Sequence, residues 1–131
     1  LRLLDDMKDT LVDAEGLGLA APQVGISKAV LIATLENDFL ELINPVIEES
    51  SGEETAIEGC LSFPGVYGEV PRAAEVVVTA INRDGRQVKL KARDLLARIL
   101  QHEIDHLNGK LFIDKVTRFI PADELKGAGA D

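Results

Sequence analysis

The two histidines of this 131-residue chain lie four positions apart, and an acidic residue follows the first of them directly. His102, Glu103 and His106 form the pattern His-Glu-x-x-His. On a helix, side chains four residues apart lie one above the other, so both imidazoles can face one metal ion. The pattern therefore predicts two ligands of a metal site, with Glu103 beside them as a general acid and base.

The helix that carries this motif is predicted to run from about Arg93 to Leu107 and to end at Asn108-Gly109. Its apolar positions place the three motif residues on the face that should be buried. Burying a carboxylate without a partner is strongly unfavourable, and a divalent cation with its bound water would compensate the charge. The alternative is an ordinary helix with two surface histidines, which does not explain why polar residues interrupt the apolar stripe.

A catalytic metal site usually has three protein ligands and an open position, so the motif needs a third ligand from elsewhere. Our preferred candidate is Cys60, the single cysteine, because a thiolate binds Fe²⁺ and Zn²⁺ strongly. The neighbouring Gly59 lets the backbone approach closely. The alternatives are an inert buried thiol at Cys60 and a downstream carboxylate ligand, for which Glu124 is the candidate. The ion would lower the pKa of its water toward about 7, and Glu103 would pass the water's proton to a leaving amine.

A glycine-rich segment, residues 16–23, follows the first helical pattern. Its Gly-x-Gly-x-x-Ala sequence, with Glu36 about 20 residues on, partly matches a dinucleotide-binding fingerprint. We disfavour that interpretation, because the glycines follow a helix and because Pro22 and Gly25 would interrupt the helix that a phosphate site needs. The segment is either a source of oxyanion donors or a turn that ends a helix, and the spacing alone assigns no role to Gln23.

The rest of the pattern predicts an α+β fold, because hairpins occur without a β-α-β alternation. Residues 2–14 are predicted to form an amphipathic helix. The stretch 48–67 is predicted to be a loop around a short extended piece, and residues 83–86 are typical of a hairpin turn. Strands are predicted at 29–34, 39–47, 76–81 and 88–90. We expect one domain, 1–131.

Composition and charge restrict the partners. The formal charge is −9, from 14 basic and 23 acidic side chains, which argues against nucleic acid because a phosphate backbone requires a positive surface. No apolar run approaches the roughly 18 residues of a membrane-spanning helix, so no membrane partner is expected. One cysteine excludes an internal disulfide and fits a reducing compartment, the cytoplasm, or an organelle if a targeting segment was removed.

Three segments in this order resemble the signature motifs of the peptide deformylases: Gly16-Leu-Gly-Leu-Ala-Ala-Pro-Gln23, Glu58-Gly-Cys-Leu-Ser62 and Gln101-His-Glu-Ile-Asp-His106. The likeness extends from about residue 2 to Val116. It implies antiparallel sheets packed around a central helix that bears the HExxH motif. It also implies an enzyme that removes the N-formyl group from N-formylmethionyl nascent chains and releases formate. The alternatives are a HExxH metallopeptidase with a downstream glutamate ligand and a non-catalytic metal-binding domain.

The resemblance also implies a metal centre. Its ligands would be Cys60, His102 and His106, and Glu103 would be the general acid and base. The family's native ion is usually Fe²⁺, and Ni²⁺, Co²⁺ or Zn²⁺ can replace it. We therefore expect one divalent metal ion, Fe²⁺ in the native protein.

The same resemblance implies how a substrate is held. The Gln23 side-chain amide and the Leu61 backbone N–H would stabilise the oxyanion, and the Gly18 backbone would pair with the substrate peptide. Four positions match the surroundings of the pocket for the methionine side chain: Leu17, Glu58, Leu95 and Ile99.

Two parts of the family's chain have no counterpart in this sequence, and we expect them to be absent. One is the segment before the first helix, and the other is the long C-terminal helix of many bacterial members. In some members that basic extension helps docking on the ribosome. Residues 123–131 are not basic here, so we expect at most a transient proximity to the ribosome.

Overall fold

The computed structural model describes residues 2–14, 16–26, 28–35, 38–60 and 63–121. The helices within these ranges are α1 (Arg2–Asp13) and α2 (Asp94–Leu107), with short 3₁₀ turns η1 (Ala21–Val24) and η2 (Phe112–Lys115). The strands are β1 (Gly18–Ala20), β2 (Val30–Leu35), β3 (Asp38–Ser51), β4 (Glu54–Gly59), β5 (Tyr67–Arg72), β6 (Glu75–Ile81), β7 (Gln87–Arg93) and β8 (Arg118–Phe119). No helix among the described residues is long and apolar enough to span a membrane.

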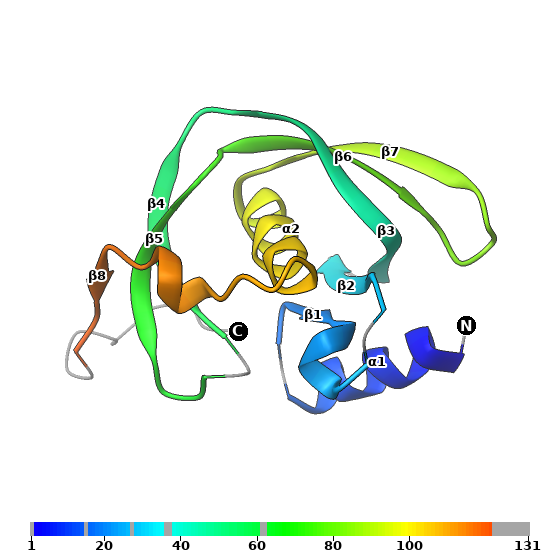
Figure 1. Ribbon diagram of the computed structural model, residues 1–131, viewed down its shortest axis with the longest axis horizontal. Coiled ribbons are helices and arrows are strands. Elements are labelled where there is room, and N and C mark those ends of the chain that lie inside the picture. Colours follow the sequence, from blue (N-terminus) through cyan, green and yellow to red (C-terminus); the bar gives the residue numbers. More distant parts are fainter. Residues whose placement is uncertain (1, 15, 27, 36–37, 61–62, 122–131) are drawn as a thin grey trace.

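The described strands form two antiparallel sheets. The larger has the order β1-β2-β3-β6-β7 and the smaller has the order β4-β5-β8. Short links after β3 and after β5 join one sheet to the other, and α2 and η2 connect β7 of the larger sheet to β8 of the smaller one. Figure 1 shows α2 in the space between the strands of the two sheets. The predicted α+β class with antiparallel sheets is confirmed.

Helix α1 packs on the first strands through one apolar stripe. Leu4, Met7 and Leu11 recur at helical spacing and are at most 2% exposed. They meet Leu19 of β1 and Ile32 of β2 in a separate apolar cluster. Fully burying such a side chain contributes about 1.5–3 kcal/mol, so this stripe holds α1 against β1. The helix predicted at 2–14 is confirmed.

The main core lies between α2 and the inner face of the larger sheet. On β6 the buried residues alternate, as a strand with one covered face requires: Val76, Val78 and Ala80. From α2, Ala97, Leu100 and Ile104 fill the opposite side. The helix predicted at 93–107 and the hairpin around 83–86 are both confirmed.

The prediction of a loop around a short extended piece at 48–67 was partly correct: β4 is the extended piece, but more of the stretch is strand than was predicted. Strand β3 continues to Ser51, β4 occupies 54–59, and β5 begins at Tyr67. The first half of β4 is exposed, so its sequence lacks the apolar alternation by which strands are recognised. Pairing with β5 holds it instead, from Glu54 opposite Arg72 to Gly59 opposite Tyr67. The glycine-rich segment 16–23 is more than a turn that ends a helix, because it contains β1 and most of η1.

Candidate active site

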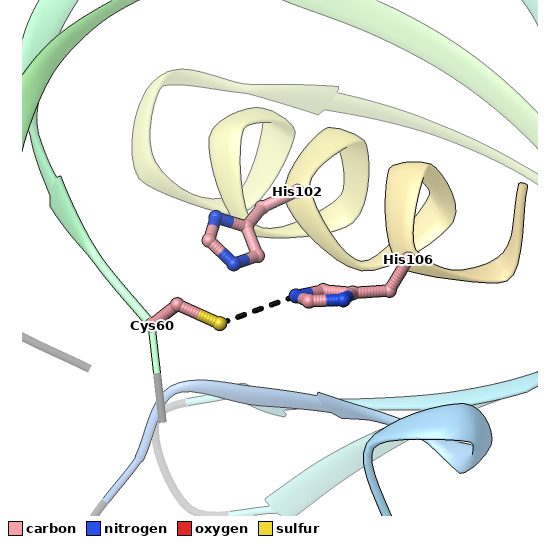
Figure 2. A group of neighbouring side chains, drawn as sticks. All are labelled: Cys60, His102 and His106. Carbon is pink, nitrogen blue, oxygen red and sulfur yellow. Dashed lines mark hydrogen bonds between the residues drawn. The ribbon is translucent and has the colours of Figure 1, made fainter. Parts of the chain in front are cut away.

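Three buried side chains from two distant segments meet at one point. Cys60 directly follows β4, whereas His102 and His106 project from successive turns of α2 toward its sulfur (Figure 2). The ligand atoms of the three residues all lie within 4.8 Å of one another. Cys60 Sγ is 3.2 Å from His106 Nε2. The structure thus brings together the three residues that the sequence suggested as metal ligands.

Local packing explains why Cys60 lies there. A Cβ atom on Gly59 would come within 2.6 Å of the Tyr67 ring, so only glycine lets the paired strand pack this tightly beside the cysteine. The carbonyl of Cys60 accepts a hydrogen bond from Phe63 N at 2.9 Å. The thiol then lies in an apolar cluster with Val70 and Phe112. Cys60 is therefore held in place by the end of the smaller sheet.

His102 lies in surroundings that favour a positive charge. Its Nδ1 is 2.9 Å from Glu58 Oε1. Burial lowers the pKa of His102, but its interactions with the nearby Cys60 and Glu58 and the charge of Glu103 outweigh it and raise the pKa to about 10. Its other ring nitrogen, Nε2, is buried and has no hydrogen-bond partner among the described residues. That nitrogen is one of the atoms that face Cys60 and His106.

The pKa of His106 is shifted in the opposite direction from that of His102. Burial, followed by the positive charge of His102, lowers the pKa of His106 to about 4. Its ring is therefore neutral at pH 7 and carries a free lone pair. A neutral imidazole is the form that binds a metal.

This donor set fits a divalent cation. One sulfur and two imidazoles, with room for a further ligand, are typical of catalytic Zn²⁺ and Fe²⁺ sites. The lone buried Nε2 of His102 would gain a partner, and the raised pKa of that ring shows that its surroundings already favour a positive charge. Both features arise from the protein's own side chains.

Glu58 links His102 to two arginine side chains. Its Oε2 accepts hydrogen bonds from Arg72 Nε and Arg98 Nη1, both at 2.6 Å, and its Oε1 accepts one from Arg72 Nη2 at 2.9 Å. Burial raises the pKa of Glu58, but hydrogen bonds from His102 and Arg72 overcome this and lower the pKa to about 2. Glu58 is therefore ionised at any physiological pH.

The two arginines connect this carboxylate to the rest of the fold. Arg72 also donates to Asp105 Oδ2 at 2.8 Å, and Lys115 lies 3.4 Å from the same oxygen. Arg98 donates to the carbonyls of Val70 and Glu54, and so ties α2 to β5 and β4. Neither arginine was predicted from the sequence as part of the site. For Arg98 a signal existed, since it lies four residues before His102 on the same face of the helix.

Glu103 and Gln23 reach the same region from two sides. Glu103 is 1% exposed and lies against Gly18 of β1, where an added Cβ would come within 2.8 Å of its Oε2. Gln23, on η1, accepts a hydrogen bond from Ala20 N with Oε1 at 2.8 Å. Its Nε2 then points to Cys60 Sγ at 3.7 Å. Leu61 and Glu124, which the sequence also suggested, lie outside the described residues.

The four residues expected around a methionine pocket have different surroundings. Leu17 packs against the cluster that contains Ile99, which is 6% exposed. Leu95 is 58% exposed and lines a hollow of about 230 Å³ beside Arg98. Both oxygens of Glu58 face arginines and His102. The position of these residues relative to a bound peptide stays a prediction.

Comparison with known proteins gives a consistent result. A family model described as Polypeptide deformylase matches residues 1–120. The peptide deformylase of Acetivibrio thermocellus is 56% identical over 124 residues, covering 95% of this chain and 73% of that relative. Peptide deformylase 1 of Bacillus subtilis is 52% identical over 126 residues, covering 95% and 79% respectively.

Solved structures agree with the sequence comparison. The peptide deformylase of Synechococcus elongatus in complex with actinonin superposes with a TM-score of 0.86 at 47% identity, covering 97% of this chain and 69% of that one. The peptide deformylase of Legionella pneumophila gives a TM-score of 0.85 at 45% identity, covering 88% and 70%.

Proposed function

We propose that this chain, which belongs to the polypeptide deformylase family, binds one divalent metal ion through Cys60, His102 and His106. As a member of the family it is a metal-dependent hydrolase that removes the N-formyl group from N-formylmethionyl peptides and releases formate. The observation that carries the proposed site is the convergence of the three ligand atoms within 4.8 Å. We propose Fe²⁺ as the native ion, with Zn²⁺, Ni²⁺ or Co²⁺ as replacements, since all accept this donor set.

Glu103 is the proposed general acid and base. A divalent cation at this site supplies Lewis acidity, which polarises a carbonyl group and makes water easier to deprotonate. Glu103 takes a proton from the attacking water and delivers it to the nitrogen of the breaking formyl–amide bond. The products are formate and a free α-amino group. Burial of Glu103 at 1% exposure keeps bulk water from competing for this proton.

The Gln23 side-chain amide and the Leu61 backbone N–H are the proposed donors to the oxyanion. For Gln23 the support is orientation: the hydrogen bond from Ala20 N to its Oε1 fixes the amide so that Nε2 faces the metal ligands. A preorganised donor of this kind stabilises the transition state because it needs no reorganisation during the reaction.

The formylmethionyl peptide is proposed to lie against Gly18, whose backbone would pair with it, and to insert its methionine side chain near Leu17, Leu95 and Ile99. Leu17 and Ile99 belong to one packed apolar cluster, as an apolar pocket wall requires. To Glu58 we assign a different role from the pocket position that the family resemblance suggested. Its carboxylate orients His102.

We also propose the domain and the cellular compartment in which the site acts. We propose that residues 1–131 act as one catalytic domain in which the two sheets surround α2, the helix that carries His102, Glu103 and His106. The compartment that suits the substrate is the one in which formylated chains are translated, the cytoplasm. Contact with the ribosome would be transient, and the net charge of −9 argues against binding nucleic acid directly.

The experiment is a formate-release assay on a short N-formylmethionyl peptide with anaerobically purified, Fe²⁺-loaded protein. Glu103→Ala should abolish release while the metal content stays at one ion per chain. Glu69→Ala, which removes a surface carboxylate paired with Arg118, is the matched control and should leave turnover unchanged. Normal turnover by Glu103→Ala would refute the assigned base.

A second comparison tests the third ligand. Cys60→Ser should lower metal affinity by orders of magnitude, whereas Glu124→Gln should not change it. The reverse result would favour a metallopeptidase-type site with a carboxylate ligand.

A further inference from the structure

We propose that Gly18 is a positioning residue for the reaction: its lack of a side chain creates the space that the Glu103 carboxylate occupies. This inference rests on the proposed role of Glu103 as the general base. It concerns the volume at Gly18 and not the pairing of its backbone with a substrate.

The space at Gly18 is limited by two side chains of α2. A Cβ atom at this position would lie 2.8 Å from Glu103 Oε2, 2.9 Å from Glu103 Cγ and 2.8 Å from Ile99 Cγ2. Carbon atoms pack best at about 3.5–4.0 Å, so all three contacts are too short. The backbone of β1 therefore rests directly on the catalytic carboxylate.

Backbone conformation does not require glycine here. Gly18 lies in β1, pairs with Ala33 of β2 and does not adopt the left-handed region. Alanine can therefore take the same conformation and keep the same N–H and C=O groups. The substitution Gly18→Ala changes only the occupied volume, which isolates the steric effect.

Neither element can move aside easily to admit a methyl group. Next to Gly18 on β1, Leu19 is 2% exposed and packs beneath α1. On α2, Leu100 is fully buried in the same core cluster as Ile99 and residues of the larger sheet. Because packed interiors tolerate little added volume, the neighbour with the most rotatable side-chain bonds has to give way. That neighbour is the end of the Glu103 side chain.

Gly18 differs in this respect from the other tightly packed glycines of the described strands. A Cβ atom on Gly59 would meet the Tyr67 ring, and one on Gly68 would meet Val116 and the carbonyl of Arg118. A methyl group on Gly59 would disturb the packing that positions Cys60, and one on Gly68 would disturb packing alone. A methyl group at Gly18 would displace the Glu103 carboxylate, which is the proposed general base.

The test is Gly18→Ala, compared with Gly68→Ala as a buried-strand control. A misplacement of about 1 Å can lower a rate by about 100-fold, so we expect kcat of the Fe²⁺-loaded Gly18→Ala enzyme to fall by about 10- to 100-fold. KM for the formylmethionyl peptide and the affinity for Zn²⁺ should change less than about threefold, because the backbone groups and the three ligands are kept. Gly68→Ala should lower the unfolding midpoint and leave kcat unchanged.

Two further measurements separate positioning from general damage. A crystal structure of metal-free Gly18→Ala should show the Glu103 carboxylate displaced while β1 and α2 keep their positions. In Gly18→Ala/Ile99→Ala the contact with Ile99 is relieved but the contact with Glu103 is not. The loss of kcat caused by Gly18→Ala should therefore persist in the Ile99→Ala background.

The outcomes are distinct. Full kcat in Gly18→Ala, or recovery of kcat in the double variant relative to Ile99→Ala alone, would overturn the positioning role while leaving the proposed base intact. Turnover by Glu103→Ala would instead remove the base itself, and the inference about Gly18 with it.

Discussion

Glu58 Oε1 lies 2.9 Å from His102 Nδ1, and this contact leaves the other ring nitrogen to face the proposed metal site. Because Glu58 is ionised, with a pKa lowered to about 2, it accepts a hydrogen bond, so Nδ1 carries the proton. The neutral ring then presents the lone pair of Nε2 to Cys60 and His106. A carboxylate behind a metal-binding histidine fixes ring orientation and raises the basicity of the ligand.

Replacing Glu58 by glutamine should therefore weaken metal binding more than it changes chemistry. Loss of such an outer partner typically lowers metal affinity by about 10- to 100-fold, and we expect that range for Zn²⁺ in a competition titration with a chelator. The unfolding free energy should fall as well, because Arg72 and Arg98 lose their buried carboxylate. The titration is therefore made at low temperature on protein shown to be folded by circular dichroism.

Glu69→Gln is the matched control for this change. Glu69 also pairs with an arginine, Arg118, but at the surface of the smaller sheet. Its replacement should leave Zn²⁺ affinity at the wild-type value. Equal affinities of wild-type protein and Glu58→Gln would show that Glu58 does not orient His102.

Metal affinity should rise with pH. In the metal-free protein the pKa of His102 is raised to about 10, so at pH 7 the ring holds a second proton that a metal ion must displace. Each unit of pH gained between 7 and 9 should raise the apparent Zn²⁺ affinity by about tenfold or more. His106 adds nothing in this range, because its pKa is lowered to about 4. Calorimetry in buffers of different ionisation enthalpy should detect at least one released proton, and a pH-independent affinity would contradict the assignment.

The raised pKa of His102 also has a consequence for the metal-free fold. A group whose pKa is higher in the folded state stabilises the fold below its unfolded pKa of about 6.5, and this contribution is lost as the pH rises through about 10. The unfolding free energy of the metal-free protein should therefore decline between those values. Saturation with Zn²⁺ should remove the decline.

How far the sequence predicted the fold depended on the source of each element's stability. Helices α1 and α2 carry their own apolar stripes, so periodicity found both within one residue of their ends. Strand β4 carries no such pattern, because its exposed first half is held by pairing with β5. Local sequence does not show which segments pair, so the sequence predicted only a short extended piece within a loop and missed the full length of the paired strands.

In the candidate site too, the sequence predicted what local spacing determines and missed what depends on contacts between distant segments. The spacing of His102 and His106 is local, so the sequence revealed it. Their meeting with Cys60 depends on how the end of β4 lies against α2, and motif resemblance supplied what spacing could not. Arg72, which pairs with Glu58, left no comparable signal, since a lone arginine on a strand is normally a surface residue.

Phe112 should be important for stability because its ring covers His102. The two rings stack at 5.8 Å with 23° between their planes, and Phe112 is 1% exposed. Phe112→Ala should lower the unfolding free energy by about 3–5 kcal/mol, measured by urea denaturation of the metal-free protein. Phe119→Ala, which removes a ring that is 57% exposed, should change it by less than about 0.5 kcal/mol. Similar losses in the two variants would refute the packing role.

Gln23→Leu should reduce the rate far more than it destabilises the fold, although it also removes the acceptor of the hydrogen bond from Ala20 N. The change removes an amide that faces the metal ligands, and loss of one oxyanion donor lowers kcat by about 10²- to 10³-fold in measured cases. Gln101→Leu provides the contrast, since Gln101 donates to the carbonyl of Ala73 and accepts from its N–H, which joins α2 to the link after β5. We expect Gln101→Leu to lower the unfolding midpoint and to change kcat by only a few-fold. If instead Gln23→Leu lost stability and kept its kcat, the glutamine would be a structural element of η1, and the oxyanion would depend on the backbone N–H alone.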